Sequence, residues 1–479
     1  GSEMCIRDRV EGPTFESQFS PSWSDNCPPG SIESTTSPAA YLTALFQWVT
    51  RVIEPLANTE EGQPVFLAAR RPDLAGLVLD NQSLERVEPT IGIVNEILES
   101  AARKHLDDHN LKDRSVDDAL LQTRYPLGLP FERYMSQINR ILQDKDHGLG
   151  DLVRQLDPEF PFFCRAGLHS LRSDDALQLD TALGPEQRAL LLEAAYFPRG
   201  ARRVSARSVQ TRSNPRTGLR ESLHTLQAGF FMRHYGVEKA DDLLPLSTFC
   251  LRTGLNQDGV ESLLSIQRYA PLASPNVPGL EAPSPARFGS VYINAGLEPT
   301  LGVTSSTGEH SLSDWSNDHF DRMQRMIRLA RWLELSFGEA DQLLDAALQA
   351  EYGSGVRDRE ISENTLRALG LFRRLRRDFK VGAEDFAALL QGVGLYARGS
   401  EIPQFDRVFN DPTLFSEPLV LDGNPFNIVP GNENEYRKIQ HLCAGLGIDY
   451  ETYLCLARCI AQAWSEEQVR ENRQDEVLY

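Results

Sequence analysis

Long apolar runs are missing from this chain of 479 residues, since no stretch of 18 or more apolar residues exists that could span a bilayer as a helix. Basic residues are too few to balance the acidic ones: 49 Lys and Arg stand against 68 Asp and Glu, a net charge of −19. Such a chain lacks the basic field that phosphate binding requires, which excludes a general nucleic-acid-binding protein. The seven Cys are an odd and small number, so we expect reduced thiols rather than a disulfide scaffold.

The local motifs of common enzyme classes are also absent. The sequence contains no GxxxxGK[ST] loop, HExxH pair, GxSxG elbow, GxGxxG fingerprint or CxxC pair. We therefore predict that the protein is not an enzyme, and we predict no catalytic, cofactor-binding or metal-ligating residues. The N-terminus has no charged segment followed by an apolar stretch, so we expect no classical secretory signal peptide.

Helical patterning is what the sequence does contain, on a background of 41% hydrophobic and 24% charged residues that is typical of a globular protein. Ser37 and Pro38 predict a helix start, because Ser is a good N-cap and Pro is tolerated at the first helical position. Apolar faces with helical spacing follow at 41–49, 91–98, 131–142, 187–195, 323–335, 366–379 and 450–464. Strand patterns are scarce, and the best strand candidate is 290–294.

One sequence device occurs four times: an apolar residue followed by apolar residues five, eight and nine positions later. The four copies are Leu255/Val260/Leu263/Leu264, Leu335/Ala340/Leu343/Leu344, Val381/Phe386/Leu389/Leu390 and Ile448/Tyr453/Leu456/Ala457. The second position of each copy is Asn256, Ser336, Gly382 or Asp449, each a permitted N-cap, so the flanking apolar residues form a hydrophobic staple. Each copy therefore predicts the second helix of a helical hairpin, and the irregular separations argue against a fixed-period solenoid.

We accordingly predict an all-α fold, an irregular array of helical hairpins with the character of a shell or solenoid. A connection rich in Pro, Gly and Ser at 271–318 is expected to be irregular or to form a short β-ribbon. The predicted divisions are a leader at 1–36 that is disordered or added for expression, a first helical region at 37–270, the connection at 271–318 and a second helical region at 319–479.

His441, Cys443, Cys455 and Cys459 form the one grouping that resembles a metal site. Cys455 and Cys459 share a helical face at i and i+4, and a Cys₃His zinc site needs the other two residues to fold back onto them. Structural zinc sites normally show tighter paired spacing. We favour the alternative, in which these thiols are small core residues of a helix beside Ala457 and Ile460.

Two segments are rich in arginine. The segment from Arg199 to Arg220 holds seven Arg and no acidic residue, which fits an anionic partner, a protease-sensitive loop or a solvated connection; we favour the last because aromatic residues are missing. The stretch 367–380 has an apolar side and an arginine side. A membrane-surface helix can have that pattern, but in an acidic chain we favour a salt-bridged surface.

Several sequence blocks resemble the A component of Tc insecticidal toxin complexes and the related virulence-plasmid A proteins. The first blocks are SPAAYL at 37–42, RRPDLAGLVLDN at 70–81 and VNEILE at 94–99, followed by YPLGLPF at 125–131. Weaker blocks follow in the family's order at 242–255, 292–296, 333–337 and 405–410, so the resemblance covers about 37–464.

The resemblance implies the N-terminal part of an α-helical shell. In full-length A components, five copies of the subunit surround a translocation channel, which the shell shields until a pH-triggered opening. The resemblance also implies a secreted protein whose partners are other toxin-complex subunits and a host surface receptor. The chain ends near the shell helices, so we expect no pore from this chain alone, and both a pentamer and a monomer stay open.

From these observations we predict a non-enzymatic structural module of a Tc-type toxin A component, without cofactors, nucleic acid or a membrane span. The alternative is a free-standing virulence protein that binds a host or toxin-complex protein through its helical surface. A further hypothesis is that the strongly negative charge makes the shell responsive to pH.

Overall fold

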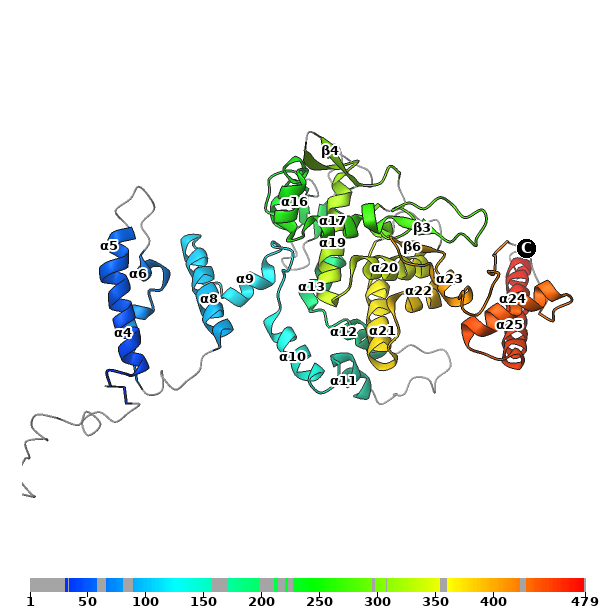
Figure 1. Ribbon diagram of the computed structural model, residues 1–479, viewed down its shortest axis with the longest axis horizontal. Helices are drawn as coiled ribbons and strands as arrows, with labels where there is room; N and C mark the ends of the chain where they lie inside the picture. Colours follow the sequence, from blue (N-terminus) through cyan, green and yellow to red (C-terminus); the bar gives the residue numbers. More distant parts are fainter. Residues whose placement is uncertain are drawn as a thin grey trace, which may run out of the picture. The chain divides into compact units, whose positions relative to one another are not determined.

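The computed structural model describes residues 31–32, 34–57, 66–80, 89–156, 171–197, 211–213, 220–222, 227–294, 298–306, 308–353, 360–422 and 428–477. Helices dominate these residues, and the strands among them are short and paired two by two (Figure 1). The predicted all-α fold is therefore confirmed. None of the described helices combines the length and the apolar character that crossing a membrane requires. Most of the predicted leader, residues 1–30 and 33, lies outside the described residues.

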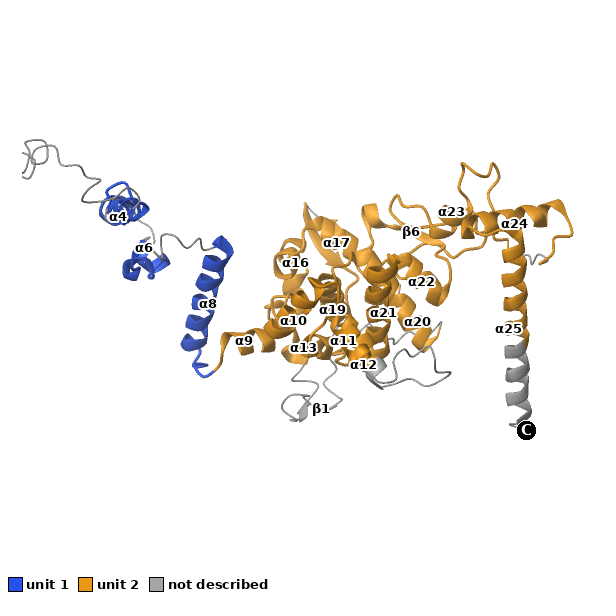
Figure 2. Ribbon diagram, turned by 90° about the horizontal axis from the view of Figure 1, so that it is seen from below, with its two compact units in different colours: residues 1–113 blue, residues 114–479 orange. Residues whose placement is uncertain are grey.

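The chain divides into two compact units, residues 1–113 and 114–479 (Figure 2). Unit 1 contains α4 (Pro38–Trp48), a π-helical turn (Val49–Ile53), α5 (Glu54–Ala57), α6 (Leu67–Arg70), a 3₁₀ turn (Leu74–Gly76) and α8 (Thr90–Asp108). The sequence patterns did not predict a boundary after residue 113. The division at 270/271 and 318/319 stays a prediction.

Unit 2 holds the remaining elements. Its first helices are α9 (Val116–Gln122), α10 (Arg133–Gln143), α11 (Leu149–Gln155), α12 (Leu171–Asp180), α13 (Pro185–Leu191), α15 (Phe230–Tyr235), α16 (Leu246–Thr253), α17 (Gln257–Leu264) and α18 (Val291–Asn294). The later ones are α19 (Asn317–Leu333), α20 (Phe337–Tyr352), α21 (Glu363–Phe379), α22 (Ala383–Gln391), α23 (Gln404–Phe409), α24 (Glu433–Leu446) and α25 (Tyr450–Val477). Two 3₁₀ turns lie at Ala240–Leu243 and Gln267–Tyr269.

The main hydrophobic core of the described chain lies in unit 2, around α19 and α20. Fourteen of the 17 residues of α19 are buried, and Leu343 and Leu344 of α20 pack in the same core. Aromatic rings of α15 pack against α19, with the ring of Phe231 5.6 Å from that of Phe320. The hydroxyl of Tyr235 donates a hydrogen bond of 2.7 Å to the carbonyl of Phe320, which satisfies its polar end inside the core.

All four predicted staples begin helices. The second positions Asn256, Ser336, Gly382 and Asp449 precede α17, α20, α22 and α25, and a helix lies three residues before each of them. Ser336 and Glu339 form the predicted capping box. The first residues of the four three-residue turns adopt left-handed backbone conformations: Gly254, Glu334, Lys380 and Gly447. The two helices contact each other in α16–α17, α19–α20 and α24–α25, which confirms the hairpin prediction there, whereas α22 packs chiefly on α20. In all four turns the left-handed residue turns the chain between the two helices.

The connection 271–318 contains both a confirmed and a wrong prediction. Strands β4 (Gly302–Ser306) and β5 (Glu309–Ser313) form an antiparallel hairpin, as the predicted β-ribbon required. The predicted strand at 290–294 is wrong, because Val291–Asn294 is the short helix α18. Asp341 of α20 accepts hydrogen bonds of 2.9 Å from the backbone N–H groups of Val291 and Tyr292. This carboxylate on another helix stabilises the helix start, and no local pattern could reveal it.

Two further strand pairs are present in unit 2. Strand β3 (Pro271–Ala273) pairs antiparallel with β6 (Tyr396–Arg398), which joins the predicted connection to the segment after α22. Strands β1 (Thr211–Ser213) and β2 (Arg220–Ser222) pair antiparallel within the arginine-rich segment. The connection therefore packs as part of unit 2.

Candidate functional site

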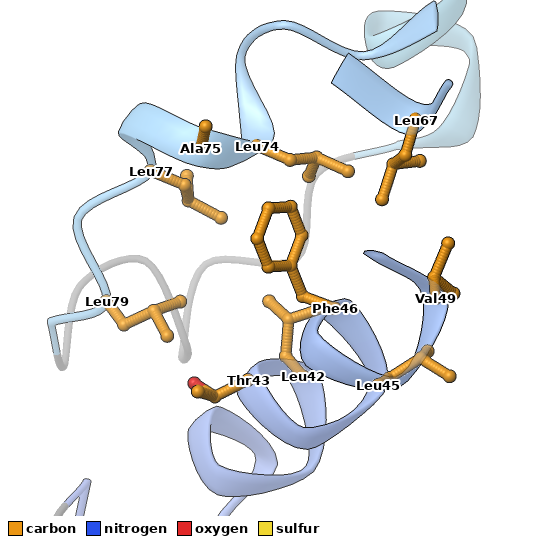
Figure 3. A pocket seen from close by; sticks show the side chains of 10 residues that line it. All are labelled: Leu42, Thr43, Leu45, Phe46, Val49, Leu67, Leu74, Ala75, Leu77 and Leu79. Carbon is orange, nitrogen blue, oxygen red and sulfur yellow. The ribbon is translucent and has the colours of Figure 1, made fainter. Parts of the chain in front are cut away.

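An apolar groove in unit 1 is the first candidate site. Figure 3 shows side chains of α4 and the π-helical turn on one wall and side chains of the segment 67–79 on the other. The groove has a volume of about 330 Å³, and Thr43 is its one polar lining residue. The other nine lining residues are Leu42, Leu45, Phe46, Val49, Leu67, Leu74, Ala75, Leu77 and Leu79.

Local sequence chemistry builds this groove. The hydroxyl of Ser37 accepts a hydrogen bond of 3.1 Å from the backbone N–H of Ala40, which starts α4 with Pro38 at its first position. At the other end, the carboxylate of Glu54 accepts a hydrogen bond of 2.5 Å from the backbone N–H of Leu67, which ties the second wall to the first. The groove contains no titratable lining residue, and its apolar side chains suit the binding of other apolar side chains.

The sequence predicted only half of this groove. The helical face through Leu42, Phe46 and Val49 was predicted, whereas Leu74, Leu77 and Leu79 were noted only for their family resemblance. Their spacing of three and two residues matches neither a regular helix nor a regular strand. Leu74 in fact lies in a 3₁₀ turn, and Leu77 follows in extended backbone. The one available signal was four apolar residues close to Pro72 and Gly76.

A second pocket, of about 670 Å³, lies in unit 2 beside α16 and the β4–β5 hairpin. Its polar lining residues include Cys250, Glu309 and His310. Burial raises the pKa of the Cys250 thiol, which opposes formation of the nucleophilic thiolate. The pocket is therefore polar and open to ligands in principle, but its thiol is not activated for covalent chemistry.

The described residues of unit 2 also include a Ser, Asp and His grouping at the N-terminus of α19. The Ser316 hydroxyl lies 3.0 Å from Nδ1 of His319 and hydrogen-bonds to Asp318, and all three residues are buried. However, the backbone N–H of Ser316 donates to the same His319 nitrogen at 3.1 Å. The grouping is thus the N-terminal capping box of α19, and burial lowers the pKa of His319.

Four arginines of α19 form a second polar arrangement, which we call the arginine row: Arg322, Arg325, Arg328 and Arg331. Each of them donates to a backbone carbonyl in a different segment. The acceptors include Tyr292 at 3.2 Å, Leu191 at 2.8 Å, Leu129 at 3.1 Å and Thr253 at 3.3 Å, in the order of the four arginines. The arginine row therefore joins α18, the end of α13, the 125–131 block and the end of α16 to one central helix.

Burial affects the members of the arginine row differently. Arg325 has a carboxylate partner, because its Nε lies 3.0 Å from Asp321. Burial lowers its pKa, but the charge and hydrogen bond of Asp321 together with the nearby Tyr292 and Glu193 outweigh burial and hold the pKa above the usual value. Arg328 has only neutral hydrogen-bond acceptors beside it, and burial lowers its pKa to about 9. Sequence analysis missed this row, although an arginine at every third position of a helix was visible.

The structure does not form a metal site from the grouping near the C-terminus. No group of three or more His, Cys, Asp or Glu residues in the described part of the chain is arranged to hold a metal. Nδ1 of the buried His441 lies 2.7 Å from the carbonyl of Phe409. Our preferred alternative for the thiols is also wrong, because Cys455 and Cys459 are exposed and Ile460 is 69% exposed. The reason is tertiary: no described element covers this face of α25.

The two arginine-rich segments have different outcomes. Of the segment from Arg199 to Arg220, only residues 211–213 and 220 are described, as parts of β1 and β2, and the others lie outside the described residues. In α21, Arg367 pairs with Glu363 at 3.1 Å and Arg377 pairs with Asp151 at 2.7 Å. The prediction of a salt-bridged surface for α21 is confirmed.

Comparisons with known proteins agree with the resemblance inferred from the sequence blocks. A family model for VRP1, the Salmonella virulence plasmid 28.1 kDa A protein, matches residues 3–256. Toxin subunit YenA1 of Yersinia entomophaga is 26% identical over 601 aligned residues, which cover 94% of this chain and 51% of YenA1. The chain therefore spans about half the length of this curated relative.

A solved structure shows the same fold. The cryo-EM structure of Morganella morganii TcdA4 aligns with a TM-score of 0.52 and 14% sequence identity, over 89% of this chain and 20% of the TcdA4 chain. The family model alone matches more than half of the sequence. This chain belongs to the family of the Salmonella virulence plasmid A protein, and it has the helical fold of Tc toxin A-type proteins.

Proposed function

We propose that this chain is a non-enzymatic structural module of a Tc-type toxin A component, the N-terminal part of a shell that shields a translocation channel. The observation that supports this most directly is the fold shared with TcdA4 over 89% of the chain. Helical hairpins packed around a central helix form walls and binding surfaces rather than reaction centres.

The use of polar side chains in unit 2 supports a non-enzymatic role. Ser316 and His319 begin a helix, and Asp341 begins another. Arg325 and Arg328 hold backbone carbonyls of neighbouring segments. These groups are buried and engaged in holding the fold, whereas a catalytic group must reach a substrate.

The same proposal includes partners and location. We propose that the chain is secreted and that its partners are proteins, namely other toxin-complex subunits and a host surface receptor. In the assembled A component it is one of five copies. The similarity to a toxin subunit, YenA1, supports a place in a multi-component complex. The apolar groove of unit 1, which has no chemical groups for catalysis, is suited to contact with another protein.

A chimera tests the proposal. This chain replaces the aligned half of YenA1, and the particles are examined by electron microscopy and light scattering beside unmodified YenA1. We expect particles of the same size and symmetry. A matched chimera with Leu343→Asp in the core of unit 2 should fail to assemble, because it places an unpaired charge among buried side chains.

Two results contradict the proposal. One is a folded chimera, with the helical circular dichroism of both parents, that never forms the particle. The other is capture of a specific host protein by the isolated chain while the chimera stays unassembled, which favours the free-standing virulence protein.

A further inference from the structure

The apolar groove of unit 1 has room for about two aromatic rings. Its volume is about 330 Å³, and an engineered apolar cavity of about 150 Å³ holds one benzene molecule. Figure 3 shows that the ring of Phe46 points toward the opposite wall, where Leu74 and Leu77 lie. A pair of aromatic side chains therefore fits the groove in both size and polarity.

The leader of this chain contains such a pair. Phe15, Phe19 and Trp23 are the three aromatic residues of the segment 1–30, and they lie within nine residues that include one charged residue, Glu16. We call residues 13–24 the aromatic leader segment. This segment lies outside the described part of the chain. The VRP1 family model matches from residue 3 onward, so the match includes it.

The aromatic leader segment is attached to the chain close to the groove. The hydroxyl of Ser37 donates a hydrogen bond of 2.8 Å to the carbonyl of Ile32, which holds the residues before α4 at the N-terminal end of that helix. Leu42, which lines the groove, follows Ser37 by five residues. The 12 residues between Phe19 and Ile32 span up to roughly 40 Å, whereas the 11 residues of α4 span about 16 Å. Phe15 and Phe19 therefore lie within reach of the whole groove.

We propose that Phe15 and Phe19 of the aromatic leader segment fill the apolar groove of unit 1 and close it to aromatic segments of other proteins. A short tether gives such a segment an effective concentration on the order of millimolar at the groove, which favours it over segments that arrive from solution. The leader is then a competitor carried by the chain itself, and a partner of the same chemistry has to displace it. The inference goes beyond the proposed function, because it concerns the isolated chain whether or not that chain assembles.

Peptide binding to the full-length chain tests this occupancy. The probe is a fluorescein-labelled peptide with the sequence of residues 13–24, and fluorescence anisotropy measures its binding. Phe15→Ser and Phe19→Ser, combined in one chain, should empty the groove. We expect this double variant to bind the probe at least about tenfold more tightly than the parent chain, because the tethered competitor has lost its two rings.

A matched double variant controls for changes to the leader as such. Ile6→Ser and Val10→Ser remove two apolar residues with the same spacing of four, also from the leader. This chain should bind the probe as weakly as the parent chain does, because its aromatic leader segment is intact.

Substitutions in unit 1 locate the binding at the groove. Thr43→Arg, added to the Phe15→Ser/Phe19→Ser variant, places a charge at a lining position and should abolish binding of the probe. Tyr41→Arg in the same background is the control, because Tyr41 is 71% exposed on the same helix and does not line the groove. Circular dichroism monitors the helix content of both chains. If Thr43→Arg lowers it, Leu77→Arg on the other wall replaces that variant.

Four outcomes overturn the inference. The first two are a probe that binds the parent chain as tightly as the Phe15→Ser/Phe19→Ser variant, and a probe that binds none of the chains. The third is a gain in binding from Ile6→Ser/Val10→Ser equal to that of the aromatic variant. The fourth is competition in the parent chain that increases with protein concentration, which places the segment in the groove of a second copy. The chimera experiment reports separately on the proposed function, because probe binding is measured on the isolated chain.

Discussion

Helix α19 of unit 2 and the helical stretch from Pro38 to Ala57 of unit 1 show opposite relations between charge and burial. Six of the 17 residues of α19 are charged, yet 14 of its residues are buried. The stretch in unit 1 has two charged residues in 20, yet Tyr41, Trp48 and Val52 are exposed. Burial of a helix therefore depends on whether neighbouring segments supply matching partners, and not on its hydrophobicity alone.

The matching partners of α19 are backbone groups. A guanidinium has five N–H donors, and each member of the arginine row directs at least one of them at a backbone carbonyl of another segment. Each arginine thus supplies a donor to a carbonyl of a segment that is distant in sequence. Unit 1 has no corresponding set within its described residues, and its apolar helices pack on few neighbours.

The largest effect should come from breaking the buried ion pair of α19. Arg325→Ala leaves Asp321 buried without its partner and removes the donor to the Leu191 carbonyl, so we expect a loss of about 3–5 kcal/mol in the free energy of unfolding. Urea denaturation followed by circular dichroism measures it. Arg103→Ala in α8 removes an exposed pair with Glu99 and should cost less than about 1 kcal/mol. Equal losses in the two variants would contradict the comparison.

A pair of leucines tests the same contrast in apolar burial. Leu343→Ala in the core of unit 2 should lower the free energy of unfolding by about 2–5 kcal/mol, because it leaves a cavity among packed side chains. Leu98→Ala in α8 should cost less than about 1 kcal/mol when the chain is kept dilute and unassociated, because the side chain is mostly exposed. Thermal unfolding at low protein concentration measures both. A large effect of Leu98→Ala in the monomer would show that α8 has a partner within its own chain.

The buried carboxyl of Asp341 should make the stability of unit 2 depend on pH. The pKa of this carboxyl is raised from 3.8 to about 7, chiefly by burial. Hydrogen bonds from the backbone of Tyr292 and Val291 oppose burial and lower the pKa. The charge of Asp345 raises the pKa further, and the charge of Arg398 lowers it. The folded chain thus binds a proton between about pH 4 and 7 that the unfolded chain has released. The contribution of this proton to the free energy of unfolding is therefore complete below pH 4 and is lost as the pH rises through 7.

Asp341→Asn should remove this dependence. The free energy of unfolding of the parent chain should fall by up to about 4 kcal/mol more than that of the variant between pH 4 and 8. Urea denaturation at a series of pH values measures the difference. Asp345→Asn leaves the carboxyl of Asp341 in place but removes a charge that raises its pKa, so it should keep the pH dependence with a smaller amplitude. Parallel pH profiles for the parent chain and Asp341→Asn would show that this carboxyl does not titrate in that range.

The smallest effects should come from the hairpin turns. Ser336→Ala removes the hydroxyl that accepts from the backbone N–H of Glu339 at 3.2 Å and should cost about 1 kcal/mol. Glu334 has a left-handed backbone conformation, where Gly254 and Gly447 occupy the equivalent positions of other hairpins. Glu334→Gly should therefore stabilise unit 2 by less than about 1 kcal/mol, measured by thermal unfolding. A loss of stability would show that the Glu334 side chain contributes more than its backbone conformation costs.

Local sequence chemistry was enough to predict many of the helices and the starts of α4, α17, α20, α22 and α25. Ser37 and Ser336 begin helices because a side-chain oxygen within three residues of the orphan N–H groups satisfies them in any fold. The hairpin turns were predictable for the same reason. The apolar face of α4 was predictable as helical, but whether it is covered was not, because that depends on segments far away in the chain.

Interactions between distant segments explain the wrong predictions. The strand predicted at 290–294 became α18 because Asp341, about 50 residues later, accepts from its first N–H groups. Cys455 and Cys459 were placed in a core on helical spacing alone, and spacing cannot show that their face of α25 lacks a neighbour. The second wall of the groove was missed because its leucines follow an irregular backbone.

By itself, the sequence determined the fold class, the starts of the helices that follow the four short turns, and the family, because each of these depends on residues close together in the chain or on blocks in a set order. The tertiary structure alone decided which helix lies at the centre and which stay exposed. The four arginines of α19 fit at the centre because backbone carbonyls from distant segments accept their hydrogen bonds. The free energy of burying a charge depends on its partners in space, and these are not neighbours in sequence.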